Sequence, residues 1–209
     1  MNLTSDIKDG EKTLDYFYQE YGNKIFNAFK QEGVKEAFES IICSAKDLGV
    51  EIIVQNENIA VEKQPAVFIF NHQSYIDGLV AIRVNKNVNA IGIAMEEMKY
   101  HPVLGPILTE AGAIFIDRKD RVKSIISLRP AAEALRNGTS VGIFPEGFIS
   151  ADGNLGPFKK GAFYMAMYGK VPLIPVVIKN SYEILPKNKK VINPGTVYVT
   201  VLDLSLIHI

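Results

Sequence analysis

The chain carries the stretch AVFIFNHQSYID at residues 66–77, in which five apolar residues lead directly to a histidine and a carboxylate. An uninterrupted apolar run of this length is typical of a strand that is buried on both faces of a sheet. We therefore expect a strand over 66–70, with His72 and Asp77 in the turn that leads to the next helix. There the carboxylate can hold Nδ1–H of the imidazole, so that Nε2 can take a proton from a hydroxyl group.

Beyond this strand, the pattern alternates between helices and strands. Pro102 and Pro106 should interrupt the helical turns between two of the strands, and Pro130 should start a second helical piece, because proline is costly inside a helix. This order predicts an α/β fold with a central mixed sheet flanked by helices. Strands are predicted at 89–94, 113–116, 140–144, 173–179 and 197–202, and helices at 75–84, 120–137 and 160–168.

The N-terminal part has a different pattern. Apolar residues recur at steps of three and four over 14–29 and again over 34–48, where Gly49 follows as a C-terminal cap. This periodicity predicts two amphipathic helices, which would make residues 1–49 a helical hairpin. Residues 51–54 and 58–61 flank a polar turn and predict a short β-hairpin before the strand at 66–70.

We expect residues 1–209 to form a single domain, since the chain has no internal repeat and no linker. The last six residues, Leu204–Ile209, are mostly apolar and lack a polar tail. This ending suggests that the sequence is a truncated form of a longer protein.

Composition limits the possible functions. Lys and Arg together number 23, as do Asp and Glu, so net charge gives no reason to expect a nucleic-acid partner. The three histidines show no metal-ligand spacing, and we expect no metal site. The chain also lacks a GxSxG elbow, a Walker A loop and a GxGxxG fingerprint, which disfavours serine hydrolases and nucleotide enzymes.

Membrane and redox features are equally sparse. No apolar stretch reaches the roughly 18 residues of a spanning helix, and the N-terminus lacks a signal-peptide core. The single Cys43 cannot form an internal disulfide and lies on an apolar helical stripe, so we expect a buried thiol in a reducing compartment.

Three further segments stand out, and two of them place charged residues at strand ends. Asp117-Arg118 follows an apolar strand, where Arg118 could either join an ion pair or hold a phosphate with its planar fork. Phe144-Pro145-Glu146-Gly147 follows another strand and could be a simple turn or a ligand-binding loop. Residues 171–176, VPLIPV, are best explained as a buried strand. In open α/β sheets ligands bind beyond the carboxyl ends of strands, so these ends should form the site.

In this order and spacing, the four blocks resemble the signature of the 1-acylglycerol-3-phosphate acyltransferase family, whose first motif is NHx4D and third is FPEG. The resemblance spans residues 65–180. It implies transfer of a fatty acyl group from acyl-CoA or acyl-carrier protein to the free hydroxyl of lysophosphatidic acid, which gives phosphatidic acid. It also implies that His72 and Asp77 form the general-base pair, that Arg118 binds phosphate, and that Glu146 and Gly147 bind the acceptor.

One departure from the family pattern concerns phosphate binding. The family usually continues Thr-Arg-Ser after its third motif, whereas this chain has Phe148-Ile149-Ser150. The missing charge could come from Lys159 and Lys160, which lie at the N-terminus of a predicted helix, although they could also be a solvated basic turn. The departure leaves two alternatives open, namely a different lysophospholipid acceptor and a catalytically silent module that binds lipid or acyl carrier.

A lipid substrate implies contact with a membrane. The aromatic residues Phe17, Tyr21, Phe26 and Phe29 could lie in the lipid interface, or they could equally pack against the sheet. We expect peripheral association with the cytoplasmic side of a membrane and no cofactor beyond the thioester co-substrate. The backbone N–H groups of Gln73 and Ser74 are candidates for stabilising the oxyanion, by proximity alone.

Overall fold

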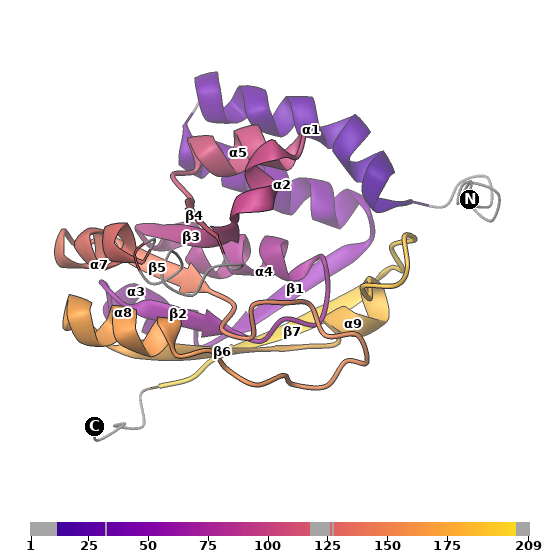
Figure 1. Ribbon diagram of the computed structural model, residues 1–209. Helices are drawn as coiled ribbons and strands as arrows, with labels where there is room; N and C mark the ends of the chain where they lie inside the picture. The colour runs from indigo at the N-terminus through magenta and orange to yellow at the C-terminus, as the bar shows by residue number, and fades with distance from the viewer. Residues whose placement is uncertain (1–11, 32, 118–125, 127, 204–209) are drawn as a thin grey trace.

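The computed structural model describes residues 12–31, 33–117, 126 and 128–203. Within these residues a seven-stranded sheet, ordered β1-β7-β6-β2-β5-β3-β4, forms the centre (Figure 1). Only β6 and β7 are antiparallel neighbours, so the sheet is mixed, as predicted. The strands are β1 (Val50–Gln55), β2 (Val67–Phe70), β3 (Ala90–Met95), β4 (Ile114–Ile116), β5 (Ser140–Ile143), β6 (Leu173–Lys179) and β7 (Gly195–Val201).

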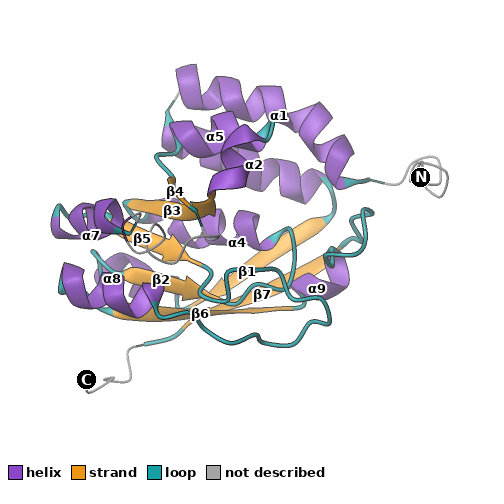
Figure 2. Ribbon diagram, viewed as in Figure 1, coloured by secondary structure: helices purple, strands orange, loops and turns teal. Residues whose placement is uncertain are grey.

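Helices cover both faces of the sheet (Figure 2). One hydrophobic core joins one face of the sheet to α1, α2, α4 and α5, and a second core joins the opposite face to α7 and α8. The helices are α1 (Leu14–Gln31), α2 (Val34–Asp47), α3 (Glu57–Glu62), α4 (Asp77–Val84), α5 (Leu104–Glu110), α7 (Arg129–Arg136), α8 (Gly161–Gly169) and α9 (Ser181–Ile184), with short 3-10 helices η1 (Asn85–Asn87) and η2 (Glu96–Tyr100).

The central strand β2 explains the apolar run that precedes His72. All four of its residues are buried. Phe68 and Phe70 belong to the core under α1, α2 and α4, whereas Val67 and Ile69 belong to the core under α7 and α8. Because both faces are covered, a polar residue is excluded at every position, and the run is continuous rather than alternating.

The predicted helical hairpin is present as α1 and α2, which contact one another. Gly49 has φ of 80°, a backbone conformation that suits glycine just after a helix. The expectation for Cys43 was wrong, because its side chain is exposed. The buried positions of α2 include Ala37, Ile41 and Ala45, and Cys43 lies two residues after Ile41, on another side of the helix.

Three of the four aromatic residues considered above pack inward, and the side chain of Phe29 lies outside the described part of the chain. Phe17 is only 5% exposed, and Tyr21 and Phe26 pack against the same core. The described residues therefore favour packing over a lipid-facing role for this group. The helix also contacts α5.

The predicted β-hairpin at 51–61 was wrong in its second half. Residues 58–61 lie in α3, and β1 pairs in parallel with β7 instead. Asn56 adopts a left-handed conformation, with φ of 58°, and turns the chain out of β1. A run of three apolar residues, 59–61, cannot distinguish strand from helix by periodicity, and in the structure Ala60 is buried against the core from the helix.

The prolines act as expected at Pro102 and Pro130 and differently at Pro106. Pro102 lies in the turn between η2 and α5. Pro130 is the second residue of α7, where its missing N–H costs nothing. Pro106 does not interrupt a helix but lies in the first turn of α5. Backbone N–H groups in the first turn have no intrahelical partner, so a proline there removes no hydrogen bond. The predicted helix at 120–137 is described only from residue 128 onward, apart from Ile126.

No helix within the described residues combines the length and the apolar content that crossing a bilayer requires.

Candidate active site

The turn after β2 is fixed to the neighbouring strand by Asn71. Its side-chain Nδ2 donates to the Ile178 carbonyl at 2.9 Å, and its Oδ1 accepts from the Ile178 N–H at 2.7 Å. This amide replaces two backbone hydrogen bonds that β2 can no longer make with β6. Because Asn71 is anchored in this way, the backbone of the next residue, His72, is held at a defined position beside the sheet.

His72 and Asp77 lie together, as the sequence predicted. Nδ1 of His72 is 3.0 Å from Oδ2 of Asp77, and the Asp77 side chain is fully buried. Because a carboxylate accepts hydrogen bonds, Nδ1 carries the proton and Nε2 is left with its lone pair. The imidazole also stacks on Phe144, with ring centroids 4.1 Å apart, which limits its rotation.

The backbone around His72 holds the Asp77 carboxylate. Oδ2 of Asp77 accepts from the N–H of Gln73 at 2.6 Å and from the N–H of Ser74 at 2.7 Å. These two N–H groups are therefore engaged and do not point to a substrate oxyanion. The prediction that the N–H groups of Gln73 and Ser74 stabilise an oxyanion was wrong, because both already donate to the Asp77 carboxylate.

Glu146 lies beneath the site and is fully buried. Its Oε1 accepts from the N–H of His72 at 2.7 Å, and its Oε2 accepts from the N–H of Gly156 at 2.7 Å. Both carboxylate oxygens are thus bound to the protein backbone. The family resemblance implied that Glu146 binds the acceptor, but in this structure it connects His72 to the loop at 150–156.

The loop at 150–156 is tied to the His72 turn by further contacts. The N–H of Ser150 donates to the His72 carbonyl at 2.8 Å, and Nε2 of Gln73 donates to the Gly153 carbonyl. Hydrogen bonds from the side chain and N–H of Asn154, and then from the Ser150 hydroxyl, lower the pKa of Asp152. These hydrogen bonds therefore hold the loop at 150–156 and the His72 turn in place relative to each other.

Gly147 and Lys159 lie against one another. Gly147 has φ of 74°, and a β-carbon there would be 2.8 Å from Nζ of Lys159. Only a residue without a side chain lets the Lys159 ammonium lie over this turn. Lys159, Lys160 and His72 all line the same cavity.

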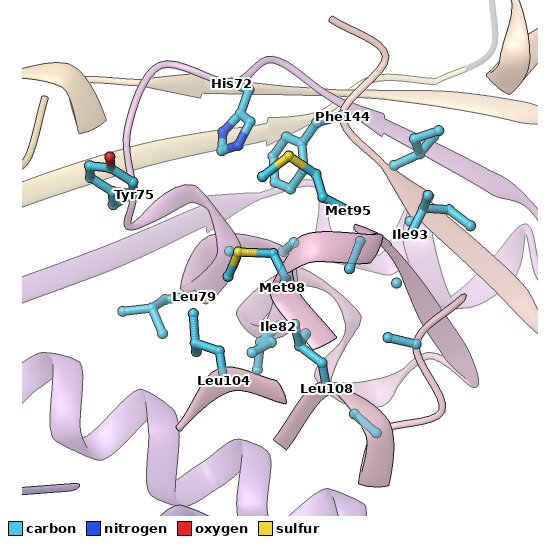
Figure 3. A pocket seen from close by; sticks show the side chains of 18 of the residues that line it. His72, Tyr75, Leu79, Ile82, Ile93, Met95, Met98, Leu104, Leu108 and Phe144 are labelled. Carbon is cyan, nitrogen blue, oxygen red and sulfur yellow. The ribbon is translucent and has the colours of Figure 1, made fainter. Parts of the chain in front are cut away.

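That cavity has a volume of about 1130 Å³ and is mainly apolar. Figure 3 shows His72 and Phe144 on one side of it and Leu104 and Leu108 of α5 on the other. Met98 also lines it, from the short helix η2. A histidine base thus lies at the edge of an apolar space that is large enough for a drug-sized ligand or larger.

Arg118 lies outside the described residues, so its predicted role as a phosphate ligand stays a prediction. Asp117, which precedes it, is described and follows β4 directly. In the sheet β4 is the edge strand, and β5 and β3 lie between β4 and β2.

Sequence reasoning missed several residues that build this site. Phe144, inside the FPEG block, stacks on His72, and the N–H of Gly156 binds Glu146. The signal for Phe144 was available, because it directly follows β5, which is the neighbour of β2. No local pattern pointed to Gly156, which lies in a polar loop.

Comparisons with known proteins give the family of the chain. The family model described as Acyltransferase matches residues 51–179. The chain is 35% identical over 159 residues to the 1-acyl-sn-glycerol-3-phosphate acyltransferase of Saccharomyces cerevisiae, covering 74% of this chain and 52% of that protein. It is 34% identical over 158 residues to the Homo sapiens 1-acyl-sn-glycerol-3-phosphate acyltransferase beta, covering 74% and 56%. The chain thus spans about half the length of these relatives.

A solved structure shares the fold. The 1-acyl-sn-glycerophosphate acyltransferase PlsC from Thermotoga maritima aligns with a TM-score of 0.69 and 24% sequence identity. The alignment covers 90% of this chain and 82% of that one. Since the family model also covers more than half of the sequence, the chain belongs to the acyltransferase family.

Proposed function

We propose that the chain transfers a fatty acyl group from a thioester donor to the free hydroxyl of lysophosphatidic acid, which gives phosphatidic acid. The observation that carries this proposal is the His72–Asp77 pair, 3.0 Å apart, at the edge of a large apolar cavity. The names of the relatives in yeast and human support the choice of acceptor.

The reaction follows from the two ring nitrogens of His72. Asp77 holds Nδ1–H, so Nε2 removes the proton of the acceptor hydroxyl as that oxygen attacks the thioester carbonyl carbon. The C–S bond then breaks, and the departing sulfur takes the proton from the imidazolium. The nucleophile is the substrate hydroxyl, so no acyl group becomes bound to the enzyme. This chemistry requires no metal or tightly held cofactor, and the donor is acyl-CoA or acyl-carrier protein.

The acyl chain of the donor has an evident place in the cavity. The lining is supplied mainly by aliphatic residues and methionines from α4, η2, α5 and β3. Burying each methylene of an acyl chain there contributes about 0.8 kcal/mol. We therefore place the thioester beside His72 and the acyl chain in the space that α4, β3, η2 and α5 enclose.

The phosphate of the acceptor needs a cation, and Lys159 and Lys160 are the candidates among the described residues that line the cavity with His72. We expect Lys159→Ala or Lys160→Ala to raise KM for lysophosphatidic acid about tenfold, because a charge-assisted hydrogen bond is lost. The effect on kcat should be smaller. Lys189→Ala, an exposed lysine outside the cavity, is the matched control. An unchanged KM in both variants would mean that the two lysines are only a solvated turn.

Contact with a lipid surface is proposed at the cavity edge rather than along α1. Phe148 is 45% exposed and Phe158 is 40% exposed, both line the cavity, and Lys159 and Lys160 follow. Exposed rings beside basic residues are typical of a surface that rests on anionic lipid. We propose peripheral binding to the cytoplasmic side of a membrane through this edge.

Flotation with liposomes that contain an anionic lipid tests this orientation. Phe158→Ser should weaken binding about tenfold, because one aromatic ring no longer enters the interface. Tyr198→Ser removes a ring that is 50% exposed on β7, and it should bind as the unaltered chain does. Equal binding of the unaltered chain and the Phe158 variant would rule out this edge as the contact surface.

An acceptor panel tests the proposed substrate. Thiol release from palmitoyl-CoA is followed with lysophosphatidic acid, lysophosphatidylethanolamine or lysophosphatidylcholine, and each lipid product is identified by mass spectrometry. We expect the highest kcat/KM with lysophosphatidic acid. A preference for a larger head group would mean that Phe148-Ile149 marks a change of acceptor. No release with any acceptor, from palmitoyl-CoA or palmitoyl-carrier protein, would favour a silent binding module.

A further inference from the structure

His101 lies between the short helix η2 and α5, in the wall of the cavity. Its Nδ1 accepts from the N–H of Val103 at 3.3 Å and from the N–H of Leu104 at 3.1 Å. Its carbonyl accepts from the N–H of Gly105 at 2.9 Å. Side chains that cap a helix satisfy its first N–H groups in this way. The His101 imidazole therefore caps the start of α5.

The ring of His101 also joins α5 to α1. Ser, Thr, Asp and Asn are the usual caps, whereas an imidazole can cap only through a nitrogen that carries no proton, so the proton lies on Nε2. The ring packs edge-on against Tyr18 of α1, with centroids 5.1 Å apart. One turn further along α1, a β-carbon on Gly22 would be 2.6 Å from Cγ1 of Val103. The start of α5 is therefore held by the cap and by close packing against α1.

The start of α5 carries residues that form the cavity wall. Leu104, whose N–H donates to His101, lines the cavity together with Leu108, one turn further on. Figure 3 shows both leucines across the cavity from His72. Met98 of η2, whose carbonyl accepts from the N–H of His101 at 3.1 Å, lines the same space. His101 is thus hydrogen-bonded to both elements that form this part of the wall.

We propose that His101 is a positioning residue for the acyl chain of the donor. This proposal rests on the acyl transfer proposed above. The cap holds Leu104 and Leu108 at one position in the wall, so that the methylenes of a long chain pack closely against them. Without the cap, the first turn of α5 loses two hydrogen bonds and the leucines no longer keep that position. A short acyl chain touches less of the wall and therefore depends less on the cap.

Two variants of His101 separate the acceptor from the ring. His101→Phe keeps an aromatic ring beside Tyr18 but has no acceptor, whereas His101→Asn has an acceptor but no ring. The measurement is kcat/KM for palmitoyl-CoA and for octanoyl-CoA at saturating lysophosphatidic acid, with the melting temperature of each variant. We expect His101→Phe to lower the ratio of the two values about tenfold, mainly through KM for palmitoyl-CoA. His101→Asn should keep the ratio of the unaltered chain.

Gln64→Ala is the matched control for the loss of a side-chain acceptor. Gln64 accepts from the N–H of Asn89 at 2.9 Å, and neither residue lines the cavity. This variant should leave the ratio unchanged, and His101→Ala replaces His101→Phe if the latter does not fold. An unchanged ratio without the acceptor would overturn the proposal. An equal fall in His101→Asn would also overturn it, because the ring and not the cap would then be responsible.

A binding measurement separates this proposal from the proposed function. Displacement of a fluorescent fatty acid by palmitate and by octanoate reports binding of the chain without any acyl transfer. A preference for palmitate that falls about tenfold in His101→Phe and is retained in His101→Asn supports the role of His101 even if no transfer occurs. Acyl transfer with the same chain-length preference in all three proteins would leave the proposed function intact and overturn the positioning role.

Discussion

Asp77→Asn should lower kcat for acyl transfer by about 10²- to 10⁴-fold while the chain stays folded. The amide oxygen of asparagine can replace Oδ2 and accept from Nδ1 of His72 and from the N–H groups of Gln73 and Ser74. The amide nitrogen then takes the place of Oδ1, which has no partner among the described residues. The turn is thus retained, but the negative charge that stabilises the imidazolium is lost.

The measurement is kcat at saturating donor and acceptor, together with the melting temperature of each variant. Glu57→Gln is the matched control, because it also removes one carboxylate, which pairs with Arg83 at 2.6 Å outside the cavity. That control should keep the kcat of the unaltered chain. If Asp77→Asn kept kcat within about threefold, then Asp77 would not assist the base.

Glu146→Gln should lower kcat at least tenfold and reduce stability by about 1–3 kcal/mol. Both oxygens of Glu146 accept from backbone N–H groups, at His72 and at Gly156. A glutamine can satisfy only one of them, and its NH₂ group then faces the other donor. Either the His72 backbone or the loop at 150–156 loses its anchor.

The way in which kcat and KM change separates two roles of Glu146. A residue that only positions His72 affects kcat, whereas a residue that binds the acceptor directly raises KM for lysophosphatidic acid. We expect the loss in kcat, a lower melting temperature and a nearly unchanged KM. A raised KM with unchanged kcat and melting temperature would contradict the positioning role and favour the direct contact that the family resemblance implied.

The features that could be predicted from sequence are those that local patterns determine. The continuous apolar run predicted the buried strand β2, because a strand that is covered on both faces of a sheet has no polar position. The five-residue spacing of His72 and Asp77 allowed the contact at 3.0 Å, because both residues belong to one turn. The apolar residues that recur at steps of three and four predicted α1 and α2 in the same way.

The features that could not be predicted depend on contacts between distant segments. Glu146 binds a backbone group 74 residues before it, and no pattern reveals such a partner. Residues 58–61 are helical because Ala60 packs into the core, which local propensity does not report. The extent of the domain, residues 1–209, stays a prediction.

Formation of phosphatidic acid by the unaltered chain and by His72→Ala tests the central claim most directly. Palmitoyl-CoA and lysophosphatidic acid are supplied together, and released thiol and lipid product are both quantified. The unaltered chain should form one phosphatidic acid for each thiol released, and His72→Ala should be slower by about 10²- to 10⁴-fold with an unchanged melting temperature. Equal rates for the two, or binding of both substrates by the unaltered chain without any product, would contradict the assignment of His72 as the general base.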